Sequence, residues 1–272
     1  MSPHTPHTPH SRRALIRAAT WTVPAVVVAS TAPAYASSVP PVSGAEVTRP
    51  SAECRIEHTM VWHRTKPTSS TTYAISSRPS LAGIDPVTVT IRTEFVDSTP
   101  ATDPAHYSFV DLKQSDATYG ITDAIKFAMT KRGTQVATMR VTFVFSRPVQ
   151  GLSFIVTDID SNDDSANQWW SPNQRDRVFI SHVNGSDAAG RFTPSQPKNS
   201  KVSGAGLSSN PWLNRTGNSA NDVTTGNVKA SFSGEVSNFS MTFENYAPSQ
   251  DGTNSINIGG MHFETQETTT AC

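Results

Sequence analysis

Cysteine, charge and helical periodicity are all scarce in this chain of 272 residues. It has two cysteines, and only 16% of its residues are charged. Apolar residues are nowhere sustained at the spacing of one helix face, which excludes the alternating βαβ pattern of a dinucleotide-binding fold. No basic stripe indicates a nucleic-acid partner. The sequence has no G-x-S-x-G, H-E-x-x-H or Walker motif, so it indicates none of these catalytic or nucleotide sites.

A long uninterrupted apolar run is missing as well. Near the N-terminus, the twin arginine at residues 12–13 precedes a weakly apolar stretch that Pro24 interrupts and that ends in small residues at Ala36. This segment resembles a bacterial twin-arginine (Tat) export signal. We therefore expect residues 1–36 to be cleaved after Ala36. The product is expected to be secreted or loosely associated with the cell surface, without a membrane span.

The expected mature chain, 37–272, would be slightly acidic. The signal holds three of the 22 basic residues and none of the 22 acidic ones, which leaves a net charge of −3. The two cysteines, Cys54 and Cys272, stand near the two ends of this chain. In an oxidising compartment they are predicted to form a disulfide, which for so long a loop contributes up to about 5 kcal/mol in the chain-entropy model. Two thiols or an intermolecular bridge remain the alternatives.

After a Pro/Ser-rich linker at 37–53, alternation of apolar and polar residues dominates. In segments such as 87–95 (apart from Thr93), 139–145 and 239–243, apolar side chains stand at every second position, which is typical of half-buried strands. We predict an all-β fold, a single antiparallel, jelly-roll-like β-sandwich over 54–265, followed by a tail at 266–272.

Several local features refine this prediction. The alternation changes phase at Gly259-Gly260, which indicates a β-bulge. Segment 122–133 could be a short helix or a strand, and the strand is favoured. Trp62 is expected in the core, and His58 and His182 fall on apolar strand faces, which predicts hydrogen-bonded core residues rather than ligands.

Five aspartates lie in the 23-residue stretch 156–178, directly after one predicted strand. Asp158 and Asp160 stand at the same alternate positions as the apolar residues before them. Their carboxylates are therefore expected on the core side of a strand end. A carboxylate there must be paired, hydrogen-bonded or metal-bound. Because clustered oxygen ligands suit Ca²⁺, we predict a calcium site that includes Asp158, Asp160, Asn162 and Asp163.

Two other interpretations of these aspartates stay open. They could cap turns and pair with Arg175 or Arg177. Alternatively, Asp158 or Asp160 could work with Glu244 as the two carboxylates of a glycoside hydrolase. The stretch is not an EF-hand, because the positions that require Gly and Glu hold other residues.

Three tryptophans lie in polar segments: Trp169, Trp170 and Trp212. Exposed aromatic rings on the loops of a β-sandwich can stack on sugars, so these three are candidate ligand-binding residues. The alternative is that each ring folds back and covers the end of the sandwich.

The segment FSRPVQGLSFIVTDIDS, followed by RDRVFI, resembles a motif of secreted and cell-surface β-sandwich proteins of bacteria, notably actinobacteria. Their strand has the form F-x-x-P-V-x-G-L-x-F-x-x-x-D-I-D, and a D-x-V follows a polar loop. The similarity covers roughly 134–265 and implies a jelly-roll fold in adhesin-like architectures. Asp158 and Asp160 match the D-I-D, and Asp176 matches the later Asp and so joins the candidate calcium ligands. A wall-anchor motif is missing, which counts against a stalked adhesin.

The favoured interpretation is an exported, non-enzymatic β-sandwich that binds a glycan or cell-envelope component and that calcium stabilises, with no organic cofactor. One alternative is an extracellular enzyme that acts on polysaccharide through Asp158, Asp160 or Glu244. The other is a structural envelope protein that associates with itself.

Overall fold

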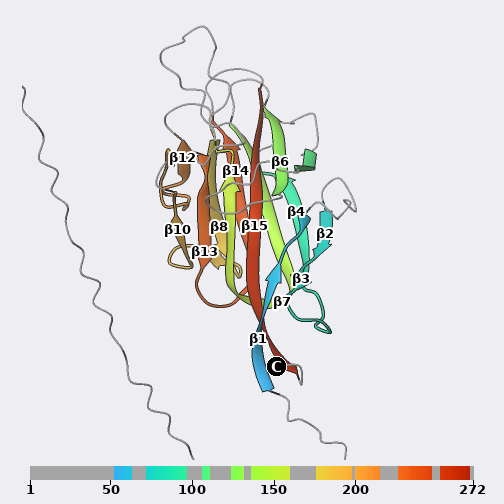
Figure 1. Cartoon of the computed structure of the whole chain (residues 1–272). Coiled ribbons are helices and arrows are strands. Elements are labelled where there is room, and N and C mark those ends of the chain that lie inside the picture. Colours follow the sequence, from blue (N-terminus) through green and yellow to red (C-terminus); the bar gives the residue numbers. More distant parts are fainter. Residues whose placement is uncertain are drawn as a thin grey trace, which may run out of the picture. The chain divides into compact units, whose positions relative to one another are not determined.

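The computed structural model shows an all-β chain, which confirms the predicted fold class (Figure 1). It describes residues 52–62, 72–96, 106–110, 124–131, 136–159, 176–197, 200–214, 226–246 and 252–269. These residues form no α-helix, and all their strand pairings are antiparallel. The strands are β1 (Ala52–Thr59), β2 (Thr72–Ser76), β3 (Arg78–Pro79), β4 (Thr88–Phe95), β5 (His106–Val110), β6 (Ala124–Lys131), β7 (Ala137–Thr157), β8 (Asp176–Val183), β9 (Ser186–Asp187), β10 (Phe192–Ser195), β11 (Val202–Ser203), β12 (Trp212–Asn214), β13 (Val228–Phe232), β14 (Val236–Asn245) and β15 (Gly252–Thr269).

The long strand β7 joins two groups of strands into one continuous antiparallel sheet. Its first half pairs with β4 up to Phe145 and with β14 up to Val149, and β14 continues to β8 and β12. Its second half, from about Gln150, pairs with β13 and β15, and β15 continues to β1 and β6. We call these sets the β14 group and the β15 group. Their arrangement is consistent with a two-layer β-sandwich.

Aromatic rings fill the space between the two groups. Phe239 of β14 stacks on Phe143, in the first half of β7, with 4.5 Å between ring centroids. It also stacks on Phe154, in the second half of β7, at 5.1 Å, and contacts Phe232 of β13 at 5.3 Å. Since Phe239 thus touches rings of both groups, this cluster holds them together; each aromatic pair adds roughly 0.5–1.5 kcal/mol beyond its buried area.

The structure confirms most of the local predictions. Segment 122–133 contains strand β6, and Trp62 is fully buried. The register between β15 and β7 shifts between Gly259 and His262, and Gly260 has φ +56°, which confirms the bulge at Gly259-Gly260. Strand β15 runs on to Thr269, so most of the expected tail is strand.

The expectation for His182 is wrong, because its side chain is exposed. Ile180 pairs with Met241 and His182 pairs with Ser240, so β8 has one extra residue, Ser181, at this point. A bulge of this kind reverses the parity of the residues that follow it. Val183 is buried in place of His182.

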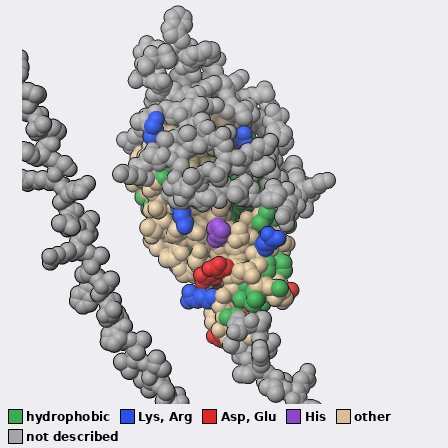
Figure 2. All heavy atoms as spheres, viewed as in Figure 1, with side chains coloured by type: hydrophobic (Ala, Val, Ile, Leu, Met, Phe, Trp, Pro, Cys, Tyr) green, Lys and Arg blue, Asp and Glu red, His purple; other side chains and the backbone are tan. Residues whose placement is uncertain are grey.

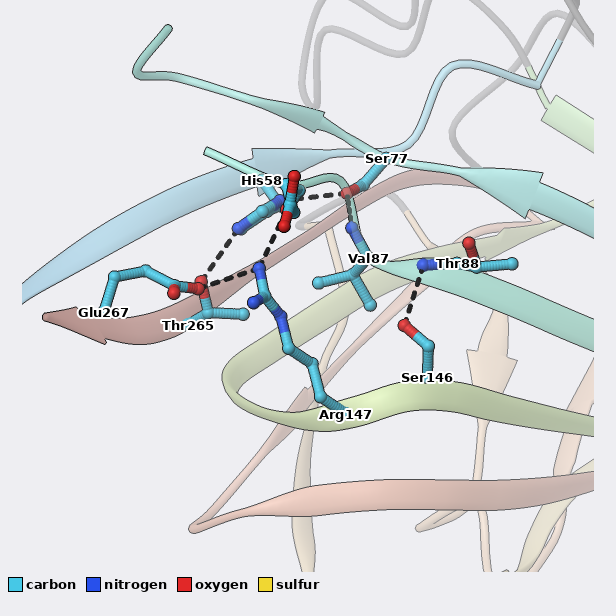
Figure 3. A network of polar contacts seen from close by, with 9 residues as sticks. His58, Ser77, Val87, Thr88, Ser146, Arg147, Thr265 and Glu267 are labelled. Atoms are coloured by element: carbon cyan, nitrogen blue, oxygen red, sulfur yellow. Dashed lines mark hydrogen bonds and ion pairs between the residues drawn. The ribbon is translucent and has the colours of Figure 1, made fainter. Parts of the chain in front are cut away.

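His58, in contrast, is a satisfied core residue, as predicted. Figure 3 shows its ring between Ser77 and Thr265, whose hydroxyl oxygens each lie 2.9 Å from a ring nitrogen. Beside it, Arg147 binds the carboxylate of Glu267 at 2.8 Å. Burial lowers the pKa of His58, the positive charge of Arg147 lowers it further, and Glu267 opposes both. The neutral imidazole can donate to one hydroxyl and accept from the other.

The N-terminal strand lies against the C-terminal one. Cys54 of β1 lies opposite Glu267 of β15, and the register continues to Ala52 opposite Thr269. Cys272 lies outside the described residues, so the disulfide stays a prediction.

The chain from Arg49 to Cys272 forms one compact unit. In the described part of the chain, no helix is long and apolar enough to cross a membrane.

We predict that Phe239→Ala lowers the free energy of unfolding by about 3–5 kcal/mol, because it leaves a cavity where both strand groups meet. Phe179→Ala on β8 is the matched control. Phe179 is partly exposed and points away from the core, so its loss should cost about 1 kcal/mol. Chemical denaturation of both variants measures the difference, and equal losses would contradict this account of the core.

Candidate functional site

A groove lies on the outer face of the β14 group, and the strand register determines what it contains. Arg140 of β7 lies opposite Thr242 of β14, which lies opposite Phe179 of β8. In the next row, Thr138 lies opposite Glu244. These positions alternate along their strands with fully buried apolar residues. Because successive side chains of a strand point to opposite faces, all five side chains point away from the core.

Short side chains make this face concave. Thr242 is 5% exposed and Thr138 is 9% exposed, although both point outward. They are screened by longer neighbours, among them Arg140, Phe179 and Glu244. The resulting cavity has a volume of about 360 Å³, within the range of roughly 300–1,000 Å³ that is typical of small-molecule sites.

The second side of the groove comes from the bulged end of β8 and the strands beside it. Ser181 and His182 line it from β8, Asp187 from β9, and Ser208 from the segment between β11 and β12. The bulge that exposes His182 therefore brings this ring to the rim. The side chain of Val96, which follows β4, is 46% exposed and lines the groove as well.

Two ion pairs lie at the groove. Arg140 binds Glu94 of β4 at 2.9 Å, and Arg177 of β8 binds Glu244 at 3.1 Å. The guanidinium of Arg177 also lies 5.6 Å from the ring centre of Tyr246. The two pairs are partly exposed, so each adds little to stability. Their effect is to hold two arginines and two carboxylates in set positions on the outer face.

The acidic strand end forms a second candidate, at the point where β7 ends. The strand stops at Thr157, and Asp158 follows with φ +67°, a left-handed conformation that Asp tolerates. Asp158 is 7% exposed and accepts a hydrogen bond of 3.2 Å from Ser255 of β15. Burial raises its pKa to about 6, although the bond from Ser255 and the charge of Lys126 both lower it.

Asp176 belongs to a buried polar network near the same end. Its carboxylate accepts a 2.5 Å hydrogen bond from the side-chain amide of Asn254, whose oxygen accepts one of 2.9 Å from Asn245. Asp176 and Asn245 pair across β8 and β14, whereas Asn254 lies on β15. The network thus links the β14 group to the β15 group, and for Asp176 it supports the interpretation of a structural, hydrogen-bonded carboxylate.

The calcium prediction rests mainly on residues that the structure does not describe. Asp160, Asn162 and Asp163 lie outside the described residues, so their position relative to Asp158 and Asp176 is not settled. Where the chain is described, no group of three or more His, Cys, Asp or Glu side chains could hold a metal ion. Calcium at this end therefore stays a prediction.

The expectation for the tryptophans needs one correction. Trp212 has no exposed surface. Its ring packs edge-on against Phe192 with 5.9 Å between centroids, and a Cβ added at Gly206 would come within 2.3 Å of it. Because no face of this ring is open to a sugar, Trp212 is a core residue that covers the end of the strands, as the alternative proposed. Trp169 and Trp170 lie outside the described residues.

The catalytic interpretation receives no support from the described carboxylates. Glu244 points into the outer groove, whereas Asp158 is buried at the end of β7, against β15. The two do not face a common cleft. The sequence pattern indicated Glu244 only as a possible catalytic carboxylate and did not predict the groove.

One residue of the groove could have been recognised from the sequence. Phe179 alternates with the buried Val178 and Ile180, so its aromatic side chain had to point outward.

Comparison with known proteins adds no relative. No protein-family model matches the chain, and no curated protein matches its sequence. The site must therefore be interpreted from its own geometry.

We predict that Asp158→Asn stabilises the protein above pH 6. The raised pKa means that folding favours the protonated carboxyl; the stabilisation is complete below pH 3.8 and is lost as the pH rises through about 6. A shift from 3.8 to about 6 corresponds to about 3 kcal/mol. The neutral amide should retain the bond from Ser255.

Denaturation of wild type and variant at about pH 4 and about pH 8 tests this. The difference in unfolding free energy should be small at the lower pH and reach about 2–3 kcal/mol in favour of the variant at the higher pH. Subtracting the wild type removes the contribution of His58, whose lowered pKa acts in the opposite direction. A variant that is less stable than wild type at high pH would show that the ionised carboxylate has a favourable partner.

Proposed function

We propose that this chain is an exported, non-enzymatic protein that binds a glycan of the cell surface or its surroundings in the groove of the β14 group. This proposal rests mainly on the cavity of about 360 Å³, whose lining combines an aromatic ring with threonine and serine hydroxyls. The export signal and the resemblance to bacterial surface proteins, both features of the sequence, support the expected location.

The lining of the groove suits the chemistry of a sugar. A pyranose ring has an apolar face, which can lie against the face of Phe179, and a rim of hydroxyl groups. Thr138, Thr242 and Ser181 offer hydroxyls that can both donate and accept hydrogen bonds. Apolar contact combined with a few placed polar groups is the usual composition of a ligand site.

A binding role is favoured over catalysis because of what surrounds the carboxylates of the groove. Glu244 is engaged by Arg177, and Asp187 accepts a 2.7 Å hydrogen bond from the backbone N–H of Ala189. Glycoside hydrolysis requires two carboxyl groups that face each other across the scissile bond, one of them a proton donor. Both described carboxylates of the groove already have an ion-pair or hydrogen-bond partner, so we expect binding without turnover.

Binding is tested with the mature chain, 37–272, and a panel of soluble polysaccharides in affinity electrophoresis. Wild type should be retarded by at least one glycan, and Phe179→Ala should weaken the retardation about tenfold, the loss expected for one ring stacked on a sugar (roughly 1.4 kcal/mol). Thr242→Val, which removes a hydroxyl at constant volume, should weaken it as well.

Val136→Ala is the control for the first variant, because Val136 is exposed and lies outside the groove. It should bind as wild type does. Retained binding in both groove variants would place the glycan elsewhere. Release of reducing sugar from any bound polysaccharide would favour the enzymatic alternative instead.

Calcium at the acidic strand end is a separate part of this proposal. Its support is the buried carboxylate of Asp158, for which the loss of solvent outweighs the favourable contributions of Ser255 and Lys126. A cation close to this carboxylate would stabilise its ionised form. The oxygen-rich segment that follows, with Asp160, Asn162 and Asp163, provides the ligand type that Ca²⁺ prefers.

We predict that about 1 mM Ca²⁺ raises the midpoint of thermal unfolding by about 5–10 °C relative to EDTA, if the site binds with a Kd of about 10 µM. The double variant Asp158→Ala/Asp160→Ala should lose this shift. Mg²⁺ at the same concentration is the control and should act more weakly, since it accepts such flexible ligand sets less readily. An unchanged midpoint in Ca²⁺ would leave the aspartates as hydrogen-bonded structural residues.

A further inference from the structure

We infer that the groove of the β14 group selects uncharged polysaccharide chains and rejects acidic ones, and that its two Arg–Glu pairs are the selecting elements. This inference rests on the proposed function, because it names the class of glycan that the same groove accepts. It concerns the ion pairs Arg140–Glu94 and Arg177–Glu244, to which the binding proposal assigns no contact with the sugar.

The first step is that the arginines at the groove, Arg140 in its lining and Arg177 beside Glu244, are already engaged. Arg140 binds Glu94 at 2.9 Å, and Arg177 binds Glu244 at 3.1 Å. A guanidinium is the usual partner of a sugar carboxylate or sulfate, because it presents paired N–H donors to two oxygens. Here an acidic sugar would compete with the carboxylate of a neighbouring strand that already contacts each guanidinium.

The second step is the balance of charge around the groove. Besides the two Arg–Glu pairs, Asp187 lines the groove without an arginine of its own among the described residues. Among the side chains that line the groove, the guanidinium of Arg140 stands against the carboxylates of Glu244 and Asp187, which leaves an excess of one carboxylate. An anionic chain would meet this excess charge, whereas an uncharged chain would not. Repulsion of one ligand class is a source of specificity in its own right.

The third step is the position of the pairs. Glu244 lies opposite Thr138, and Arg140 lies opposite Thr242, so each pair borders one of the two threonines that form the low part of the groove. A chain that rests on these hydroxyls passes between the pairs. Removing one carboxylate should therefore expose an arginine to the bound chain without changing the hydroxyls or Phe179.

The experiment compares neutral probes (dextran, mannan and a mixed-linkage β-glucan) with acidic ones (polygalacturonate, alginate and hyaluronate). Wild type, Glu244→Gln and Glu94→Gln are measured at low salt and at about 1 M NaCl, where exposed charges are screened within about 3 Å. Glu235→Gln is the matched control, since it removes the same charge from an exposed residue that directly precedes β14, at the end of the strand away from Glu244.

Wild type should bind at least one neutral probe and bind the acidic ones at least tenfold more weakly. Glu244→Gln and Glu94→Gln should each bind acidic probes about fivefold more tightly than wild type at low salt, the effect of one partly exposed charge. This gain should vanish at high salt and be missing in Glu235→Gln. In Glu94→Gln, whose residue does not line the groove, neutral binding should stay within about twofold of wild type.

Tighter binding of an acidic probe than of every neutral one by wild type would overturn the inference while leaving the proposed glycan function intact. The same holds if the two groove variants gain no more than Glu235→Gln. If wild type binds no probe of either class, or if Phe179→Ala binds as wild type does, the proposed function itself fails and the inference falls with it.

Discussion

The contact between Phe239 and the two halves of β7 is the constraint on which the rest of the structure depends. Phe143 and Phe154 belong to the same strand, yet both stack on Phe239. This is possible because β7 pairs first with β14 and later with β13 and β15. One strand thus supplies rings to both sides of the core. The relative position of the two strand groups follows from this packing, and so does everything built on their outer faces.

The groove lies on the outer face of the strands whose inner face forms this core. Between the buried residues of β7, β8 and β14 stand outward residues such as Thr138, Thr242 and Phe179, and the register that stacks the core also sets them in rows. On the face shown in Figure 2, the basic and acidic side chains that can be seen are scattered and mixed in sign. The groove therefore differs from a charged binding surface: ring, hydroxyl and compensated ion pairs together favour a polar but uncharged ligand.

Local alternation was sufficient to predict the all-β fold, strand β6, the bulge at Gly259-Gly260 and the burial of Asp158. It failed for His182, because a single extra residue in β8 reverses parity and nothing in the sequence around it marks the bulge. It also left open whether Trp212 faces solvent, which depends on the distant Phe192. The groove combines residues from strands far apart in the sequence, so alternation alone could show that Phe179 points outward but not what lies beside it.

Backbone amide chemical-shift mapping with a bound neutral glycan tests the central claim most directly, because it reports on every candidate site in one titration. The account predicts that the largest shifts fall on 138–142, 177–182 and 240–244, the three adjacent strand segments that form the groove. Shifts centred on Asp158, Ser255 and the network around Asn254, or on the outer face of β15, would contradict it and would move the binding site to the acidic end or to the opposite face.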